Sequence, residues 1–225
     1  MKSELKQDSI TMLLVNRTYL YRLLQNLFGN EPTLKTLHIL DSDHTRTALT
    51  LLSLEDGLHG VEVFFKQLET NMEDTLEKCC SEYTRLFIGP TTLPAPPWES
   101  VYLTKERLIF QESTLKVRQC YLKYNYLPAN YRSEPDDHIA LELDFMANLS
   151  HLTENFFQEG KISEGVDILK DQKAFLEEHL LVWAPQFAAE LEASTPHPLY
   201  QGIASIIKEF LQADLVVIDE ILESI

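Results

Sequence analysis

The chain contains little glycine. Only 7 of its 225 residues are glycine, whereas average usage is about 7%. Tight hairpin turns depend on this residue, so the shortage argues against a many-stranded β fold. Hydrophobic residues make up 44% of the chain, and a chain of this length can bury a substantial core. We therefore expect one folded domain over residues 1–225.

Cysteine is equally scarce, and the three cysteines cannot all pair. Cys79 and Cys80 are adjacent, Cys120 stands alone, and no CxxC motif suggests a redox or zinc site. We expect all three to be reduced cysteines of a cytoplasmic protein that pack as small hydrophobic side chains.

Export signals and membrane spans are also absent from the sequence. The N-terminal residues offer only a short apolar patch interrupted by polar residues, and no stretch approaches the roughly 18 apolar residues of a membrane span. The net charge of −16 argues against nucleic acid as a partner, because phosphate binding needs a basic surface. A cationic partner fits this charge better.

The common enzyme signatures are missing as well. The sequence has no GxxxxGK[ST], GxGxxG, GxSxG or HExxH pattern. His138 and Glu142 are one helical turn apart, but no third ligand with matching spacing accompanies them, so we expect no metal. We expect no catalytic residue and no cofactor, and hence a protein that is not an enzyme.

Helical periodicity dominates what remains. Apolar residues at spacings of three and four, with breaks at Gly and Pro, predict an all-α bundle of about eight to ten helices. The expected helices cover residues 8–28, 33–54, 61–87, 104–125, 135–156, 162–181, 184–193 and 199–223. The helix over 104–125 has Leu108, Leu115, Cys120 and Leu122 among its apolar positions, and Pro185 is expected to separate two helices.

One segment is clearly not helical. Four prolines, Pro90, Pro94, Pro96 and Pro97, forbid a continuous helix and stiffen the backbone. The segment is either a structural connector with Trp98 as a core plug, or a rigid aromatic surface that binds an extended or amphipathic peptide at little entropic cost.

A second segment carries more acidic residues than folding requires. The segment is Glu134-Pro135-Asp136-Asp137-His138. Either Glu134 or the preceding Ser133 can cap the helix that follows, and Pro135 suits the first turn of that helix. The apolar stripe of that helix is expected to comprise Ile139, Leu143, Met146, Leu149, Leu152 and Phe156. Capping needs one acid, whereas crowded carboxylates repel each other and favour a cation, for which a bidentate arginine is the best match.

These two segments resemble the signature segments of the TorD/DmsD family of redox-enzyme maturation chaperones. EYTRLFIGPTTLPAPPWESVYL is similar to the family's L-F-x-G-P…P-x-P-P-W-x-S-V pattern, and EPDDHIALELDFM to its E-P-x-D-H motif. The tail HLLVWAPQFAAELEASTPHPLYQGIA is similar to the family's closing section. The likeness covers roughly residues 82–204, whereas the first eighty residues match only in helical character.

The resemblance implies a system-specific cytoplasmic chaperone that assists a molybdenum-cofactor oxidoreductase before export. Its implied partners are the twin-arginine signal peptide and the catalytic subunit of that molybdoenzyme. The implied leader-binding residues are Leu86, Phe87, Pro97, Trp98, Tyr102, Glu134, Pro135, Asp137 and His138. The sequence departs from relatives at Thr91, where some have tryptophan.

Three alternatives stay open at this point. The protein could be an assembly factor for a nitrate-reductase-like enzyme without a classical leader, or a weak nucleotide-binding protein, although no phosphate-binding loop is present. The connector at 127–134 could act as a hinge between two helical halves. We expect mainly a monomer, with a domain-swapped dimer as the minor form.

Overall fold

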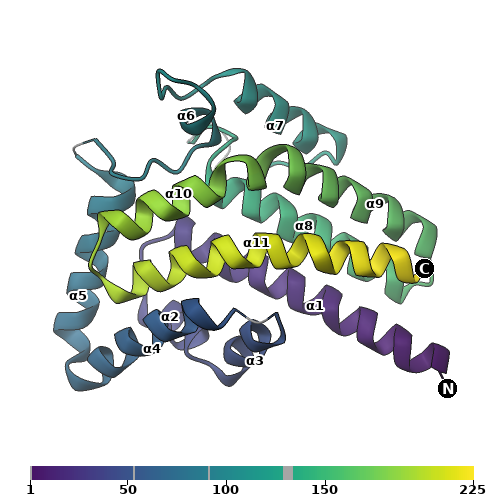
Figure 1. The fold of residues 1–225 in the computed structure, drawn as a ribbon, viewed down its shortest axis with the longest axis horizontal. Coiled ribbons are helices and arrows are strands. Elements are labelled where there is room, and N and C mark those ends of the chain that lie inside the picture. The colour runs from purple at the N-terminus through teal and green to yellow at the C-terminus, as the bar shows by residue number, and fades with distance from the viewer. Residues whose placement is uncertain (1, 53, 91, 129–133) are drawn as a thin grey trace.

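The computed structural model describes residues 2–52, 54–90, 92–128 and 134–225, and it confirms the all-α fold (Figure 1). The described part contains no strand, only an isolated bridge between Trp98 and His138. Two π-helical turns, η1 (Thr84–Ile88) and η2 (Leu176–Leu180), interrupt the helices. The α-helices are α1 (Lys2–Gly29), α2 (Leu34–Leu40), α3 (Asp43–Leu51), α4 (Glu55–Thr70), α5 (Met72–Tyr83), α6 (Glu99–Leu103), α7 (Glu112–Lys123), α8 (Ile139–Gln158), α9 (Ile162–Phe175), α10 (Leu181–Ser194) and α11 (Pro198–Ser224).

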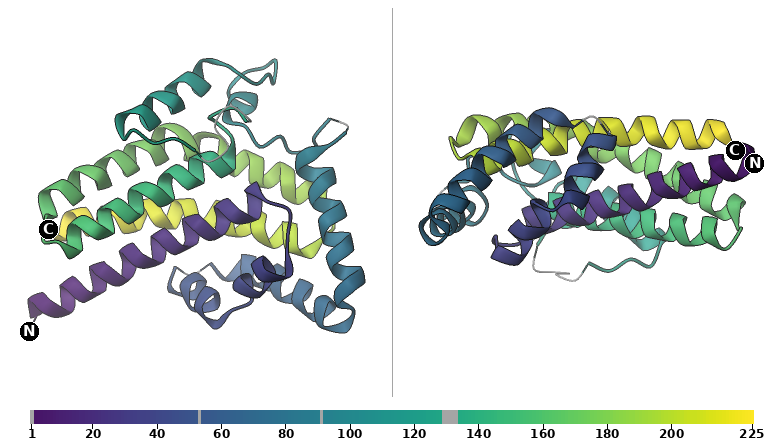
Figure 2. Two further views of the ribbon diagram at one scale, coloured as in Figure 1. Left: turned by 180° about the vertical axis from the view of Figure 1, so that it is seen from behind. Right: turned by 90° about the horizontal axis from the view of Figure 1, so that it is seen from below.

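The long helices run along the long axis of the molecule. α1 packs along α8, and α11 packs against both α4 and α10. α5 crosses one end of this bundle at a steep angle, while both termini lie at the opposite end (Figures 1 and 2). α7 lies on the outside, where Tyr121 packs against Phe145 of α8 and Phe175 of α9.

α8 is the centre of the core. Its first half is buried on nearly every side, so it is surrounded by other helices and not merely covered on one face. The first four residues of the predicted apolar stripe, Ile139, Leu143, Met146 and Leu149, are fully buried. Leu152 and Phe156, nearer the end, are only half-buried.

Three glycines set the crossing of α4 and α11. A Cβ atom added at Gly202 would lie 2.9 Å from the Gly57 carbonyl oxygen and from the Val61 nitrogen. A Cβ atom at Gly60 would lie 3.0 Å from the Gly202 Cα. The two backbones therefore touch, which a larger side chain on either helix would prevent.

A buried ion pair joins α1, α9 and α11. Arg17 Nε donates to Asp214 Oδ1 at 2.5 Å, and Arg17 Nη2 donates to Gln172 Oε1 at 2.7 Å. The Tyr21 hydroxyl also donates to Asp214, at 2.6 Å. Because each charge has a partner and further hydrogen bonds, the pair is tolerated in the interior.

Two of the predicted helices are each divided in two. The helix expected over 33–54 consists of α2 and α3, because Thr33 and Ser42 each accept a hydrogen bond from a backbone N–H three residues later and so start separate helices. The helix expected over 61–87 is divided into α4 and α5, which continues into η1, because Asn71 caps a new helix in the same way. Polar capping residues decided these boundaries.

The prediction for residues 104–125 was wrong in its start and in its buried face. The left-handed backbone at Arg107 (φ 51°) and Phe110 (φ 62°) cannot continue a right-handed helix. α7 therefore starts at Glu112, and Leu108 lies outside it. Leu115 and Leu122 are 54% and 66% exposed, while the helix buries Ser113, Thr114, Val117 and Tyr121.

The start of α8 also differs from the prediction. The helix begins at Ile139, and His138 caps it by accepting a hydrogen bond from the Ala140 N–H at 3.1 Å. Glu134 and Asp137 therefore precede the helix and are not part of its first turn. Ser133, the other expected cap, lies outside the described residues.

Pro185 does not separate two helices. It lies inside the continuous helix α10, and the bend between α9 and α10 occurs at η2 (Figure 1). A π-helical turn changes the hydrogen-bond register of a helix, so the chain bends at η2 and not at the proline that was expected to separate two helices.

The proposed hinge cannot be placed. Its residues 129–133 lie outside the described part of the chain, as does Thr91.

Within the described part, no helix is both long enough and apolar enough to cross a membrane.

Candidate functional site

The two unusual sequence segments meet in space. The Glu99 N–H donates to the Asp137 carbonyl at 3.0 Å, and the Ile139 N–H donates to the Pro97 carbonyl at 2.9 Å. These bonds flank the isolated bridge between Trp98 and His138. We call the paired residues 96–100 and 134–139 the motif junction.

Asp137 is a structural part of this junction. Its side chain is fully buried, and its Oδ2 accepts a hydrogen bond from the Ser100 N–H at 2.8 Å. The carboxylate thus satisfies a backbone donor at the start of α6, as a helix-capping acid does.

The neighbouring acid, Asp136, fixes α7 to the junction. Arg118 Nε donates to its Oδ2 at 2.7 Å. The Tyr121 hydroxyl donates to its backbone carbonyl at 2.9 Å. Side chains on one face of α7 therefore hold the junction in place.

His138 is neutral in this arrangement. Burial lowers the pKa of His138 to about 4, and its Nδ1 accepts the Ala140 N–H, which leaves the proton on Nε2. Its ring packs edge-on against Trp98, with the ring centroids 5.7 Å apart. This histidine is a helix cap and a packing surface for the indole.

Trp98 and Glu134 form the accessible part of the junction. Trp98 is half-buried and Glu134 is exposed. Burial raises the pKa of the Glu134 carboxyl, and the nearby Trp98 indole N–H, which makes no hydrogen bond of normal geometry, opposes this shift. An aromatic side chain and a carboxylate therefore lie next to each other at the surface.

The other predicted site residues are mostly covered. Leu86, Pro97 and Pro135 are buried. Phe87 is half-buried, and it packs against Phe28 of α1, Tyr83 of α5 and Tyr200 of α11.

Tyr102 is also half-buried. It packs at a tilt against Trp183, and the Arg107 guanidinium lies 5.0 Å from its ring centroid. The structure thus brings together Pro97, Trp98 and residues 134–138, whereas Leu86 and Phe87 pack with other helices.

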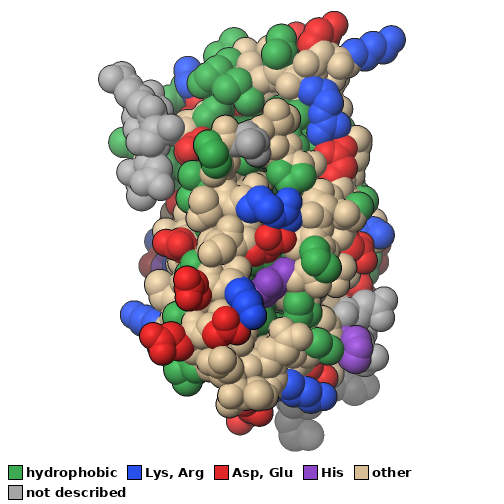
Figure 3. All heavy atoms as spheres, turned by 90° about the vertical axis from the view of Figure 1, so that its left-hand side faces the viewer, with side chains coloured by type: hydrophobic (Ala, Val, Ile, Leu, Met, Phe, Trp, Pro, Cys, Tyr) green, Lys and Arg blue, Asp and Glu red, His purple; other side chains and the backbone are tan. Residues whose placement is uncertain are grey.

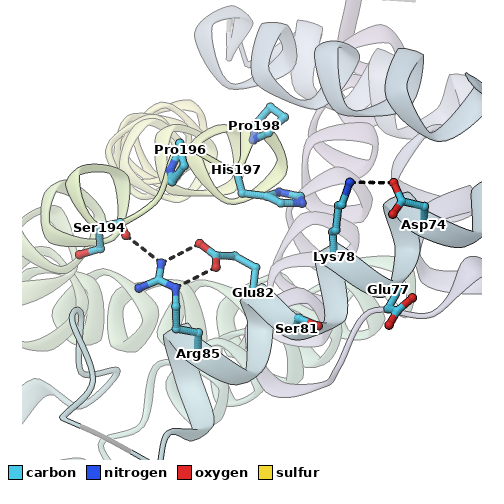
Figure 4. A pocket seen from close by; sticks show the side chains of 10 residues that line it. All are labelled: Asp74, Glu77, Lys78, Ser81, Glu82, Arg85, Ser194, Pro196, His197 and Pro198. Atoms are coloured by element: carbon cyan, nitrogen blue, oxygen red, sulfur yellow. Dashed lines mark hydrogen bonds and ion pairs between the residues drawn. The ribbon is translucent and has the colours of Figure 1, made fainter. Parts of the chain in front are cut away.

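A wide groove of about 790 Å³ lies between α5 and the turn that joins α10 to α11 (Figure 4). Arg85 spans it, with two hydrogen bonds to Glu82 at 2.8 and 2.6 Å and a third to the Ser194 carbonyl at 2.8 Å. His197 lines the groove and packs between Phe64 and Tyr200.

A second hollow, of about 630 Å³, shares Asp74, Lys78 and His197 with this groove. Figure 3, which faces the side that α5 covers, shows acidic and basic side chains interspersed there. Sequence reasoning missed the groove. The sequence feature that marks the groove is the series of opposite charges three and four residues apart along α5 and η1.

Behind the junction lies a buried polar cluster that the sequence did not reveal. Glu99 on α6 pairs with His179 on η2 at 3.0 Å. The Trp183 indole N–H donates to Glu142 Oε2 at 3.3 Å. Burial, together with the charges of Glu99 and Asp137, raises the pKa of Glu142 well above its usual value. In the described part of the chain, no group of such side chains is arranged to hold a metal ion.

Comparison with known proteins finds one matching family and several similar chains. Residues 41–189 match the family described as nitrate reductase delta subunit. The chain is 30% identical over 203 residues to the chaperone protein TorD of Aliivibrio salmonicida, covering 88% of this chain and 93% of that protein. For TorD of Vibrio vulnificus the identity is 29% over 202 residues, covering 88% and 92%.

A third relative is described as the probable Tat proofreading chaperone DmsD of Haemophilus influenzae. It is 32% identical over 148 residues, which cover 65% of this chain and 66% of that protein. All three relatives are named as chaperones and not as enzymes, in agreement with the expectation drawn from the missing catalytic motifs.

Proposed function

This chain belongs to the TorD/DmsD family of redox-enzyme maturation chaperones, and we propose that its client is a molybdenum-cofactor oxidoreductase whose twin-arginine leader binds at the motif junction. Binding in the cytoplasm would shield the leader until the catalytic subunit has received its cofactor. The observation that carries this proposal is the adjacent placement of Trp98 and Glu134 at the surface of the junction.

The chemistry of the pair suits an arginine. A guanidinium can stack on the face of an indole and donate two hydrogen bonds to a carboxylate at the same time. A lysine ammonium cannot reproduce this geometry, because it is a point charge without a planar fork. The net charge of −16 also favours approach of a cationic peptide.

The buried residues of the predicted site have a supporting role in this proposal. Pro97 and Asp137 are covered in this conformation. Asp137 holds the start of α6 by its bond to the Ser100 N–H. Both residues would keep Trp98 in position, while the half-buried rings of Phe87 and Tyr102 could contact the apolar part of the leader.

Calorimetry with a synthetic leader peptide tests the proposal. Glu134→Gln should weaken binding by roughly 1.5–3 kcal/mol, the range for hydrogen bonds to charged groups. A peptide with both arginines replaced by lysine should lose a similar amount against the unmodified protein. Glu220→Gln removes an exposed carboxylate of α11 near the opposite end of the molecule and serves as the matched control.

Trp98→Ala separates binding from folding. We expect the leader affinity to fall further than the melting temperature, because part of the ring is accessible. Equal affinities for the arginine and lysine peptides, with Glu134→Gln and Glu220→Gln indistinguishable, would show that the leader does not bind here.

The family description gives a reason to test one alternative client. Its name refers to nitrate reductase, which fits the alternative of an enzyme without a classical leader. Isolation of the complex from native lysate, followed by N-terminal sequencing of the bound subunit, distinguishes the two. A subunit without a paired-arginine N-terminus would favour the alternative.

A further inference from the structure

Three side chains other than the accessible pair Trp98 and Glu134 form a nucleophile–imidazole–carboxylate line. Cys120 of α7 lies with its Sγ 3.9 Å from Nε2 of His179 on η2. Nδ1 of His179 lies 3.0 and 3.2 Å from the two carboxylate oxygens of Glu99 on α6. Three separate elements contribute to the line, so its order is a product of the tertiary fold.

The geometry assigns a role to each nitrogen of the imidazole. A carboxylate accepts hydrogen bonds only, so Nδ1 of His179 carries a proton and donates it to Glu99. Nε2 then faces the Cys120 sulfur, and in the imidazolium form of His179 it donates its proton to that sulfur. Glu99 stabilises the resulting imidazolium, as the third member of such a line does in thiol and serine nucleophiles.

A small pocket opens beside the sulfur. Its volume is about 100 Å³, and its walls include Cys120, His179, Phe145 and Phe175. One water molecule takes about 30 Å³ of liquid volume, so the pocket admits a reagent of only a few atoms. Cys120 itself is partly accessible, whereas His179 and Glu99 are only 4% and 1% exposed.

We propose that Cys120 is a reactive thiol that hydrogen peroxide oxidises to a sulfenic acid, with His179 as the proton carrier and Glu99 as its positioning residue. The Cys120 thiolate, paired with the His179 imidazolium, attacks one peroxide oxygen. The O–O bond breaks, and the leaving hydroxide takes the proton from Nε2 to become water. The sulfur loses two electrons and the peroxide gains them.

The other two cysteines lack this environment and act as internal controls. Cys79 is buried, and burial raises its pKa to about 12. Burial and the nearby Glu31 raise the pKa of Cys80. Cys80 is partly accessible, like Cys120, but its sulfur faces the Pro32 carbonyl and not an imidazole. The comparison therefore sets a sulfur beside an imidazole against one near a carboxylate, and the His179 variant isolates the effect of the imidazole.

The experiment uses the reduced full chain. Hydrogen peroxide is added at pH 7, sulfenic acid is trapped with dimedone, and each cysteine peptide is quantified by mass spectrometry over time. Cys120 should react at least about tenfold faster than Cys80. This factor is smaller than the rate enhancement that a positioned acid or base usually provides. His179→Gln should remove this advantage, while His151→Gln, at a partly exposed position of α8, should leave it unchanged.

A second variant covers the case in which His179→Gln fails to fold. Glu99→Gln keeps a hydrogen-bond acceptor for Nδ1 but removes the negative charge. The charged groups around His179 and its partner Glu99 are Glu178, the Lys123–Asp171 pair at the pocket, and Glu142, whose pKa the Glu99 charge helps to raise. Removing the Glu99 charge should shift the pH profile of Cys120 oxidation upward.

Two results would overturn the proposal. One is equal oxidation rates for Cys120 and Cys80 in the unmodified protein. The other is an unchanged Cys120 rate and pH profile in a folded His179 or Glu99 variant. Neither measurement involves a leader peptide, so its outcome is independent of the proposed client.

Discussion

Removal of the buried Arg17 charge provides the sharpest test of how the long helices are held together. Arg17 and Asp214 are both completely buried. Arg17→Met keeps much of the side-chain volume but leaves the Asp214 carboxylate with the Tyr21 hydroxyl as its remaining hydrogen-bond donor. Breaking one side of such a pair costs roughly 3–5 kcal/mol, because a charge stays buried without its partner.

Thermal and denaturant unfolding measure this loss. In a chain of this size, each kcal/mol lowers the melting temperature by roughly 2–4 °C. The expected drop for Arg17→Met is therefore roughly 6–20 °C, from the same cost of a broken buried pair. Lys78→Met, which removes the exposed Lys78–Asp74 pair of α5, is the control and should leave the melting temperature nearly unchanged.

The double variant Arg17→Met/Asp214→Leu completes the cycle. Apolar residues of similar size often replace a buried ion pair without loss, so the double variant should be more stable than either single variant. A loss below about 1 kcal/mol in Arg17→Met would refute the reasoning, as would a double variant whose loss equals the sum of the two single losses.

The remaining predictions concern packing, pH and assembly. Gly202→Ala should destabilise the fold by about 1–3 kcal/mol, because its Cβ would meet the α4 backbone; an unchanged denaturation midpoint would contradict this. The free energy of unfolding should fall on both sides of about pH 6.5. Burial alone would lower the pKa of His179, but its hydrogen bonds to Cys120 and Glu99 outweigh burial and raise this pKa to about 9. The stability that protonated His179 contributes to the fold is therefore lost as the pH rises from 6.5 through 9. The pKa of His138 is lowered to about 4 by burial, so its stabilisation is lost as the pH falls from 6.5 through 4. Denaturant titrations from pH 4 to 10 measure both, and a flat profile would exclude both effects. Size-exclusion chromatography of refolded protein at two concentrations should show mainly monomer; a dimer peak that persists on dilution would contradict that expectation.

The amino-acid sequence by itself determined the fold class and the family. Scarce glycine and sustained helical periodicity predicted an all-α bundle. The two contiguous segments at 82–103 and 134–146 identified the chaperone family. Both inferences rest on residues that are close together in the chain, where backbone preferences and side-chain spacing act directly. Helix boundaries were less accurate, since single capping residues such as Ser42 and His138 decided them.

The tertiary structure alone decided which side chains are accessible. Asp137 and Glu134 looked equivalent in sequence, yet one is fully buried and the other is exposed. Likewise, α7 turns Leu115 and Leu122 to the outside and buries Ser113, Thr114, Val117 and Tyr121. Its inner face must fit between Phe145 and Phe175 of two other helices, and no pattern within α7 encodes their shape.

The pairing of distant residues also depended on the fold. Cys120, His179 and Glu99 are separated by tens of residues in the chain, and none belongs to a recognisable catalytic motif. The same holds for Arg17 and Asp214, which lie near opposite ends of the sequence and meet only because α1 and α11 pack side by side. Contacts of this kind follow from the mutual packing of whole helices, and local sequence patterns do not predict them.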